Sequence, residues 1–486
     1  MSELKRIAIV GGGISGLTAA YKLLRQAHSQ NLEIKIDLFE KKELGGVFKT
    51  IEDSENECRI ECGPDSFFTK TPEVLELSKE LEIDSQIIAT NSKKRKSLVA
   101  KDDRLIPLPD GFVMIAPSNI DSFMQSELMS EAGKARALEE QNIAPRTDLS
   151  EETVAQFVER RFGKEMLDKI IQPMVGGIYT GDVNKLSAEA CLPEFVLMER
   201  TKGSIITALA ESQNTGKEAD TKGARYSAFY SFEKGMSFLI DTLRQKIVEM
   251  NGPTFNLHEV VLSMKKMPGG KWSLVTQNQN SVAYDAVILA LPASSLAEVM
   301  TEVDSTIAKN ASQIYCASSC VVNLIFDKSD IDKSKLDGFG FVVPEESRRA
   351  LIACSYLSVK YKHRSPEQKV ILRAFLGGVH NEDVLKESDE KLTQLALEEL
   401  EYFLQIKNKP EYTSVSRWQD AMPQYTIGHQ ERIEAITQRL EDFPGIFITG
   451  NFISGVGIPK CVQLASVAAM NVVQFLKVQK TAQVID

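Results

Sequence analysis

The feature that most constrains this chain lies in its first forty residues, where an apolar strand leads through a glycine-rich turn into a helix. Residues 7–10 form a run of four apolar side chains, and Gly11, Gly13 and Gly16 follow as G-x-G-x-x-G. Glycine at these positions lets the backbone approach a pyrophosphate at the N-terminus of the helix. The helix after the turn has its apolar residues on one face, which predicts that it packs on a sheet.

An acidic residue completes the pattern. A second apolar stretch over residues 34–39 predicts a strand that ends at Glu40. Glu40 follows Gly16 by 24 positions, near the offset of about 20 at which an acid accepts hydrogen bonds from ribose hydroxyls. The combination predicts a dinucleotide site, against the alternative of a bare turn beside a surface glutamate. The motif alone serves FAD and NAD alike.

Two further glycine turns favour FAD. Gly45-Gly46 lies just beyond Glu40, where flavoproteins bring backbone close to the cofactor, although an ordinary loop turn is the alternative interpretation. Near the other end, Gly455-Val456-Gly457 precedes a helix, a layout that closes over a flavin ring. Because the chain has no second G-x-G-x-x-G, we expect the organic substrate to donate the electrons and dioxygen to accept them.

Length and composition limit the remaining classes of protein. A chain of 486 residues exceeds the ~250–300 that one core supports, so at least two cores are expected. The net charge of −10 argues against a nucleic-acid binder, and the basic run 93–96 is interpreted as a solvated turn. Seven cysteines without a C-x-x-C pair fit a reducing compartment, so the cytoplasm is expected. The His and Cys spacings suggest no metal site.

The rest of the chain predicts mixed secondary structure. We expect a small antiparallel sheet from residues 260–264, 272–276 and 286–290, more strands at 320–326, 340–343 and 370–376, and helices over much of 118–210 and near 389–405. One of these helices is expected to begin near residue 150, with Asp148 or Ser150 as its N-cap and Gly163 as its stop. No stretch approaches the ~20 consecutive apolar residues of a membrane span, and residues 1–10 do not resemble a signal peptide.

Four motifs in combination resemble a known family. They are Gly63-Pro64-Asp65-Ser66, the stretch 176–182 (GGIYTGD), the stretch 422–429 (MPQYTIGH) and the stretch 455–459 (GVGIP). Together they look like the Gram-positive protoporphyrinogen/coproporphyrinogen oxidases, and the resemblance runs almost end to end. The chain departs from the family pattern at Lys41, Val47, Asn451 and Lys460, which puts individual contacts in doubt more than the fold.

The resemblance implies an α/β fold in which an FAD-binding Rossmann-like domain is interleaved with an α+β substrate domain and a helical domain. The FAD domain is expected from residues 1–75, 225–295 and 411–486, and the substrate domain from 76–117 and 296–410. The helical domain is expected at 118–210, where some members contact membrane surfaces. The expected location is therefore the cytoplasm, and peripheral attachment to the inner face of the cell membrane stays open.

The implied FAD contacts come from several of the glycine motifs and from two isolated side chains. They are Gly11, Gly12, Gly13, Ile14, Ser15, Gly16, Glu40, Gly46, Gly63, Pro64, Asp65, Ser66, Val261, Trp418, Gly455, Val456 and Gly457. Val261 is the least secure of them, since Val260 fits nearly as well. No side chain is assigned a catalytic role, because the flavin carries the chemistry.

The implied reaction removes six electrons from coproporphyrinogen III or protoporphyrinogen IX through FAD, with hydrogen peroxide formed. The porphyrin would be handed to a ferrochelatase. The substrate site should be an apolar slot with cations for the propionates. Lys70 is the preferred cation, with a surface lysine as the alternative interpretation, and Gly177, Ile178 and Tyr179 are expected in the slot wall. Tyr425 and His429 are weaker candidates.

Three other functions stay open at this point. A flavin amine oxidase would share the FAD motifs, and it would need an aromatic cage to bind the amine. A carotenoid desaturase would act on a long apolar chain. A tetrapyrrole-binding protein with a structural flavin would carry out no reaction.

Overall fold

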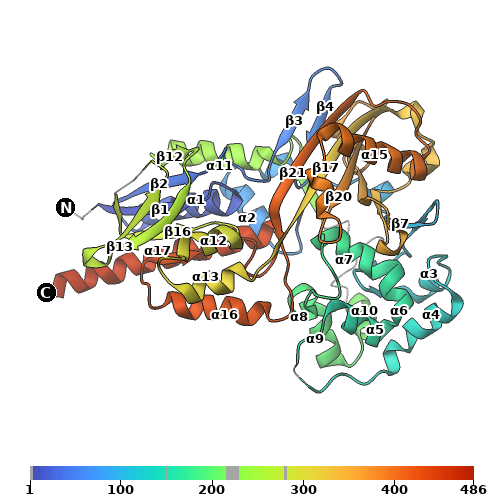
Figure 1. Ribbon diagram of the computed structural model, residues 1–486, viewed down its shortest axis with the longest axis horizontal. Helices are drawn as coiled ribbons and strands as arrows, with labels where there is room; N and C mark the ends of the chain where they lie inside the picture. The colour runs from blue at the N-terminus through green and yellow to red at the C-terminus, as the bar shows by residue number, and fades with distance from the viewer. Residues whose placement is uncertain (1–3, 149, 215–228, 279–281, 486) are drawn as a thin grey trace.

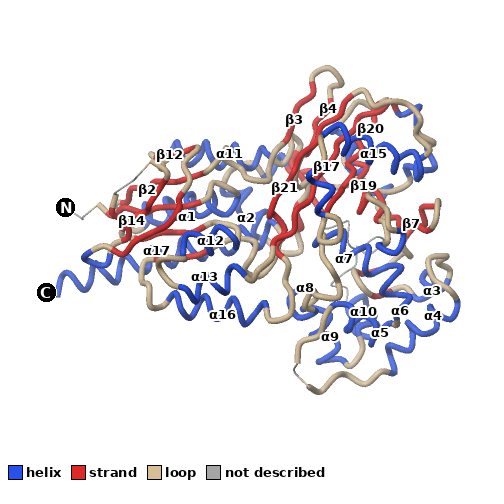
Figure 2. Tube along the Cα trace, in the orientation of Figure 1, coloured by secondary structure: helices blue, strands red, loops and turns tan. Residues whose placement is uncertain are grey.

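The computed structural model describes residues 4–148, 150–214, 229–278 and 282–485. The parts of the expected domain segments at 1–3, 149, 225–228, 279–281 and 486 lie outside these described residues. Figure 1 shows a lobe with a parallel sheet that holds both ends of the chain, a second lobe with a larger sheet, and a helical lobe beside it. The chain mixes helices and strands throughout (Figure 2), so the expected α/β class is confirmed.

The parallel sheet of the first lobe has five strands. Their order is β12 (Thr254–Leu257), β2 (Ile34–Glu40), β1 (Lys5–Val10), β16 (Ala286–Leu289) and β22 (Ile446–Ile448). Every neighbouring pair is parallel, with Ile7 opposite both Ile36 and Ala286. The chain passes to opposite sides of β1 in β2 and β16, and ligands of open α/β sheets bind at such a switch point, beyond the carboxyl ends of the strands.

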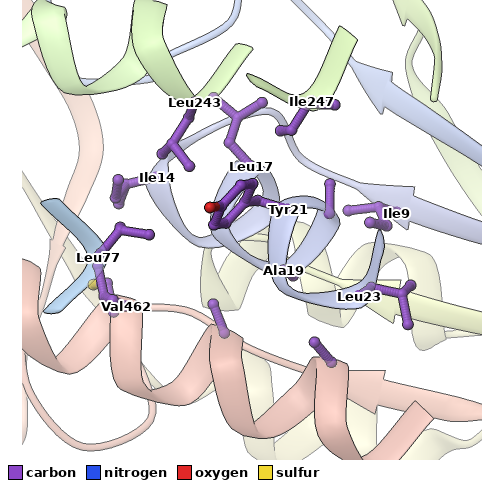
Figure 3. Close-up of a cluster of buried hydrophobic side chains, with 14 of the residues drawn as sticks. Ile9, Ile14, Leu17, Ala19, Tyr21, Leu23, Leu77, Leu243, Ile247 and Val462 are labelled. Atoms are coloured by element: carbon purple, nitrogen blue, oxygen red, sulfur yellow. The ribbon is translucent and has the colours of Figure 1, made fainter. Parts of the chain in front are cut away.

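Successive residues of β1 pack into different cores, as expected for a strand that is buried on both faces. Ile7 and Ile9 belong to the core under α1 (Ile14–Ser29), α11 (Ser237–Glu249), α2 (Glu73–Glu80) and α17 (Ile458–Ile485). Figure 3 shows Leu17 of α1 directed toward Leu243 and Ile247 of α11. The Tyr21 ring points to the side of Leu77 of α2, and its hydroxyl donates to Glu80 O of that helix at 3.2 Å.

The opposite face of the parallel sheet is covered by another set of elements. Ala8 and Val10 pack there. The covering elements are α12 (Ala293–Met300), α13 (Ser305–Ser312), α16 (His429–Leu440) and the antiparallel sheet β13 (Val261–Lys266), β14 (Trp272–Thr276) and β15 (Ala283–Tyr284).

The sheet of the second lobe has seven strands. Their order is β21 (Tyr412–Pro423), β17 (Cys316–Asp327), β20 (Lys369–Gly377), β19 (Leu351–Tyr356), β18 (Gly340–Val342), β7 (Leu98–Lys101) and β8 (Arg104–Pro107). All neighbours are antiparallel except β18 and β7. One face packs against α15 (Asp389–Leu404), whose Leu392, Ala396 and Leu400 are buried.

Short strands join the two lobes. A hairpin is made of β3 (Thr50–Asp53) and β4 (Cys58–Glu61), and a three-stranded sheet of β5 (Phe67–Phe68), β11 (Phe229–Phe232) and β6 (Ile87–Ala89). The short helix α14 (Leu357–Lys360) follows β19 in the chain, and its Lys360 Nζ lies 5.8 Å from the centre of the Phe229 ring of β11. These elements carry the chain from the parallel sheet to the seven-stranded sheet, and so they surround the space between the lobes.

The helical lobe begins after the small ladder of β9 (Phe112–Val113) and β10 (Ala116–Pro117). Its helices are α3 (Ile120–Met124), α4 (Glu131–Leu138), α5 (Val154–Phe162), α6 (Lys164–Met166), α7 (Gln172–Tyr179), α8 (Ala188–Cys191), α9 (Pro193–Lys202) and α10 (Ile205–Asn214). The N-cap of α5 is Thr153, which forms a capping box with Gln156, rather than Asp148 or Ser150. Gly163 ends α5 as expected.

The structure shifts three of the expected domain limits. Residues 76–80 of α2 pack in the core of the first lobe, as do α12 and α13 on its other face, although both segments were expected in the substrate domain. Conversely, β21 pairs with β17 in the seven-stranded sheet, outside the FAD domain. The stretch 286–290 was also expected in the small antiparallel sheet, but β16 pairs with β1 instead. Strand partners depend on tertiary packing, and local pattern does not encode them.

The last helix is the one described helix whose length and composition would allow it to cross a membrane, over Ile458–Val478 with a mean hydropathy of 1.4. It packs along α1, and Val462, Ala465, Ala469 and Val472 are buried in the core that they share. One face of α17 is therefore part of the core of the first lobe, while Val467, Met470 and Val478 of the same helix are exposed.

Candidate functional site

The glycine turn lies at the carboxyl end of β1 and leaves no room for side chains at two positions. A Cβ on Gly11 would lie 2.1 Å from the Ala290 carbonyl oxygen, and one on Gly16 would lie 1.8 Å from that of Gly11. The Gly11 N–H donates to Phe39 O of β2 at 2.8 Å. These contacts fix the turn against the edge of the sheet, which places the N-terminus of α1 at the switch point.

Gly13 is the N-cap of α1 and faces open space. No side chain caps the helix, its first turn has no acid, and a Cβ on Gly13 would meet nothing within 4 Å. The unpaired N–H groups of a helix N-terminus attract an anion. The residues present therefore fit the pyrophosphate of a dinucleotide. Ile14 and Ser15 lie in this first turn and are buried.

Glu40 is directed at the same turn. Its carboxylate accepts hydrogen bonds from the Gly12 N–H at 2.7 Å and from the Lys42 N–H at 2.8 Å. Glu40 also lies opposite Leu257 of β12, and its carbonyl accepts from the Glu259 N–H at 3.0 Å. Val261 follows Glu259 by two residues and begins β13. The arrangement suits a ribose held between Glu40 and the turn.

The second glycine pair packs on the first. The Gly45 N–H donates to Gly12 O at 2.8 Å, and a Cβ on Gly46 would lie 3.5 Å from Gly13 Cα. Gly45 and Gly46 both have positive φ, at 108° and 60°, a region that glycine adopts without cost. The loop after β2 thus extends the surface formed by the first turn.

The loop 63–66 joins this surface to the seven-stranded sheet. A Cβ on Gly63 would lie 1.8 Å from Val47 O, so only glycine fits there. Trp418 of β21 donates its indole N–H to Cys62 O at 2.7 Å. Gly63 O also accepts a hydrogen bond from Arg373 of β20. Trp418 therefore bonds the residue before Gly63, and a Cβ on Gly63 would lie 3.7 Å from Trp418 Cζ2.

Asp65 lies between two cations that the sequence analysis did not identify. Lys360 Nζ lies 2.7 Å from Asp65 Oδ1 and 3.1 Å from Ser66 Oγ, and Arg373 Nη1 lies 3.0 Å from Asp65 Oδ2. Burial by itself would raise the pKa of Asp65, but the charges of Lys360 and Arg373 lower it well below its usual range. Asp65 is thus a carboxylate that fixes the loop, and Pro64 stiffens the turn before it.

The C-terminal turn approaches the same surface from the other end of the chain. α17 begins at Ile458, directly after Gly455-Val456-Gly457, and has no acid in its first turn. Cys461 in that turn lies against the Ser15 hydroxyl of α1, and burial raises the pKa of its thiol to about 11. Two helix N-termini therefore converge, and both favour negative charge on a bound group.

Tyr425 holds the C-terminal turn in place. Its hydroxyl accepts from the Gly455 N–H at 2.9 Å and donates to Asn451 O. The ring is buried and lies 4.4 Å from that of His429, whose Nε2 lies 3.1 Å from Ile453 O. Burial lowers the pKa of His429, so its ring is neutral at pH 7. Tyr425 and His429 of the MPQYTIGH stretch therefore hold the backbone of residues 451–455 in place.

Replacing Tyr425 with phenylalanine is expected to weaken FAD binding at least tenfold, since it leaves two half-buried backbone groups of the turn without their partner, and an unpaired buried group costs ~1–3 kcal/mol. Equilibrium dialysis against FAD measures the effect. The matched control is Tyr356→Phe, because the buried Tyr356 hydroxyl has no hydrogen-bond partner among the described residues. Equal FAD affinity in both variants would remove Tyr425 from this role.

A cavity of about 180 Å³ lies beside the loop 63–66. Its lining includes Gly177 and Ile178 of α7, as expected, together with Lys360. The remaining lining is Ser97, Met174, Phe229 and Val342. We call this the inner cavity. It is apolar apart from Ser97 and Lys360, so it has the composition of a slot for a flat apolar ligand.

Gly177 also lines a larger cavity of about 780 Å³, which we call the outer cavity. It lies between α7 and the ends of β18, β19 and β20, and its lining includes Thr180, Val343 and Gly378. A Cβ on Gly177 would lie 3.3 Å from Val342 Cγ1. The two cavities are thus separated by little more than the backbone of α7 at this residue.

The other two predicted substrate residues lie elsewhere. Tyr179 donates its hydroxyl to Cys191 O at 3.3 Å within the helical lobe, and it lines neither cavity. Lys70 is exposed, with Nζ 5.9 Å from the centre of the Phe68 ring. Phe68 in turn stacks on Phe229 at 5.2 Å, and Phe229 lines the inner cavity. Lys70 therefore lies outside the inner cavity, and the rings of Phe68 and Phe229 lie between its ammonium group and the cavity.

The sequence analysis did not predict the roles that three residues of this region have in the structure. Lys360 and Arg373 carry no motif, and Tyr425 was expected at the substrate. The sequence could have indicated a buried role for Arg373, because this residue lies within the otherwise apolar run 370–376. A charge in such a run needs a buried partner. Within the described residues, no group of three His, Cys, Asp or Glu side chains is placed to hold a metal ion.

Comparisons with known proteins found flavoenzyme relatives that match nearly the whole chain. The family described as flavin containing amine oxidoreductase matches residues 14–473. A coproporphyrinogen III oxidase from Bacillus subtilis is 29% identical over 97% of this chain and 98% of its own length, and one from Staphylococcus aureus is 30% identical over 96% and 99%. The crystal structure of an Exiguobacterium protein, provisionally assigned as a protoporphyrinogen oxidase, aligns with a TM-score of 0.84 at 28% identity, over 98% of this chain and 100% of that one.

Proposed function

This chain belongs to the flavin-containing amine oxidoreductase family, and from that premise we propose that it oxidises a porphyrinogen to the porphyrin, with coproporphyrinogen III preferred to protoporphyrinogen IX. The protein is an FAD-dependent oxidoreductase. The substrate is proposed because relatives that it covers almost completely are named for these two porphyrinogens.

The observation that carries the proposal is the position of the inner cavity. Lys360 lines it and also contacts Asp65 and Ser66 of the loop 63–66. A ligand in the inner cavity would therefore lie next to the segment that we propose contacts the flavin. The cavity is smaller than the ~300–1,000 Å³ of ordinary small-molecule sites. In the proposal, the substrate extends past Gly177 into the outer cavity.

Bound FAD would accept six electrons from the methylene bridges of the substrate, two at a time, and pass them to dioxygen with formation of three molecules of hydrogen peroxide. The chain supplies binding and orientation. The N-terminus of α1 and Glu40 would hold the nucleotide end. Trp418 and the Arg373–Asp65–Lys360 cluster would fix the loop 63–66, and Tyr425 would fix the turn 455–457.

The test is a direct assay of both porphyrinogens with the purified holoenzyme, following porphyrin fluorescence and peroxide. We expect turnover of coproporphyrinogen III with three peroxides per porphyrin. Turnover of simple amines, with no porphyrin formed, would identify an amine oxidase, and turnover of a carotene would identify a desaturase. Under anaerobic conditions, a flavin that stays yellow with bound porphyrinogen would identify a tetrapyrrole-binding protein. Contact with a membrane surface and hand-over to a ferrochelatase belong to the same proposal.

Lys70 is the proposed partner of one propionate at the rim. Lys70→Met is expected to weaken the apparent affinity for coproporphyrinogen about ten- to a hundredfold, since a charge-assisted hydrogen bond is worth ~1.5–3 kcal/mol. The flavin spectrum should not change. Lys79→Met, an exposed lysine of α2, is the matched control. If both variants bind both porphyrinogens like the parent protein, Lys70 is a surface lysine only.

A further inference from the structure

A hollow of about 640 Å³ opens on the second lobe, away from both cavities described above. Five lysines line it, and we call it the basic hollow. They are Lys94, Lys328, Lys333, Lys362 and Lys369. They come from three stretches of the chain, at residue 94, residues 328–333 and residues 362–369, and Lys94 belongs to the basic run 93–96 that was interpreted as a solvated turn. Tertiary packing therefore adds four more cations to that run.

The positive charge of the basic hollow is only partly neutralised. Glu367 is the single carboxylate among its lining residues. Lys94 pairs with Asp337 at 2.6 Å, and Lys369 pairs with Glu411 and, at 3.9 Å, with Asp327. Lys328 donates to the Glu367 carbonyl at 3.3 Å, and neither Lys333 nor Lys362 forms an ion pair in the described part of the chain. Three ammonium groups thus face the hollow without a carboxylate of their own.

This charge contrasts with the rest of the protein. The whole chain carries a net charge of −10, so a concave cluster of cations is a local reversal. Like charges around one concave surface repel each other, and a concave wall of low dielectric focuses their field on the enclosed space. An anion in the basic hollow would relieve the repulsion and accept several charge-assisted hydrogen bonds at once.

The walls suit a small molecule. Asn91 and Ser358 add polar groups, while Leu336, Val359 and Val370 give the hollow an apolar part. Its volume lies within the ~300–1,000 Å³ of ordinary ligand sites. We infer that the basic hollow binds a small molecule with at least two oxyanion groups, either phosphates or carboxylates.

This site is separate from the proposed substrate site. The basic hollow shares no lining residue with the inner cavity. Ser358 and Val359 of α14 line the hollow, whereas Lys360 of the same helix contacts Asp65 and lines the inner cavity. The inference therefore stands whether or not the porphyrinogen proposal holds.

The test measures anion binding to the FAD-saturated protein by isothermal titration calorimetry, with inorganic pyrophosphate as the phosphate probe and citrate as the carboxylate probe. We expect at least one of them to bind with one-to-one stoichiometry. The double variant Lys333→Gln/Lys362→Gln should weaken that binding at least tenfold. Raising the salt from about 50 mM to about 200 mM should weaken it as well.

The matched control is Lys265→Gln/Lys266→Gln, which removes the same two charges from exposed positions of β13. It should bind the probe like the parent protein. Full FAD content in both variants verifies that they fold. Absence of binding for both probes, or equal loss in the control, overturns the inference. Binding to phosphatidylglycerol vesicles without binding of either small anion would assign the surface to a membrane instead and would also overturn it.

Discussion

Replacing Gly13 with valine is expected to give a folded protein that binds FAD at least a hundredfold more weakly. Gly13 has φ −77° and ψ −173°, which any residue adopts, and no atom lies within 4 Å of its Cβ position. The side chain therefore costs the fold little. It would occupy the space in front of the α1 N-terminus, where a pyrophosphate accepts charge-assisted hydrogen bonds worth ~1.5–3 kcal/mol each. Loss of two such bonds gives the expected factor.

FAD content after purification and the thermal transition together measure this effect. The comparison variant is Gly16→Ala, whose Cβ would lie 1.8 Å from Gly11 O. That variant should lose both the fold of the turn and the cofactor. Gly13→Val should lose the cofactor alone. Full FAD occupancy in Gly13→Val would move the pyrophosphate away from α1 and contradict the proposed cofactor site.

Replacing Arg364 with methionine is expected to destabilise the protein by about 3–5 kcal/mol, the cost of leaving one partner of a buried ion pair alone. Arg364 Nη2 lies 3.0 Å from Glu61 Oε1, and both side chains are fully buried. The same nitrogen donates to Ser231 Oγ at 2.7 Å and to Phe232 O at 3.0 Å. Arg364 thus joins β4 to β11 next to the loop 63–66.

Chemical denaturation with tryptophan fluorescence measures the loss. Glu61→Gln/Arg364→Met serves as the partner variant, because removing both charges avoids an uncompensated carboxylate. It should recover a large part of the lost stability. If the double variant is as unstable as the sum of the two single variants, the two side chains do not act as a pair.

The sequence determined the nucleotide end of the site. The strand, glycine turn, helix and Glu40 are contiguous, and their function depends on spacing along a single segment. The FAD cofactor, favoured by the glycine turns, is confirmed, as are the family, the enzyme class and the α/β fold implied by the resemblance. The individual FAD contacts, the substrate residues and the preference for coproporphyrinogen stay predictions. Several strands were also found from their apolar runs, because burial on both faces leaves a continuous pattern.

Only the tertiary structure decided which segments meet. Asp65 and Arg373 are 308 residues apart, and their contact depends on β20 lying beside the loop 63–66. For the same reason, local pattern did not predict that β16 pairs with β1 or that β21 pairs with β17. It also did not predict that the Tyr425 hydroxyl bonds to the Gly455 N–H. A local pattern shows that a strand or a charge is buried. It does not identify the partner, because strand order and ion pairing are set by the packing of distant segments.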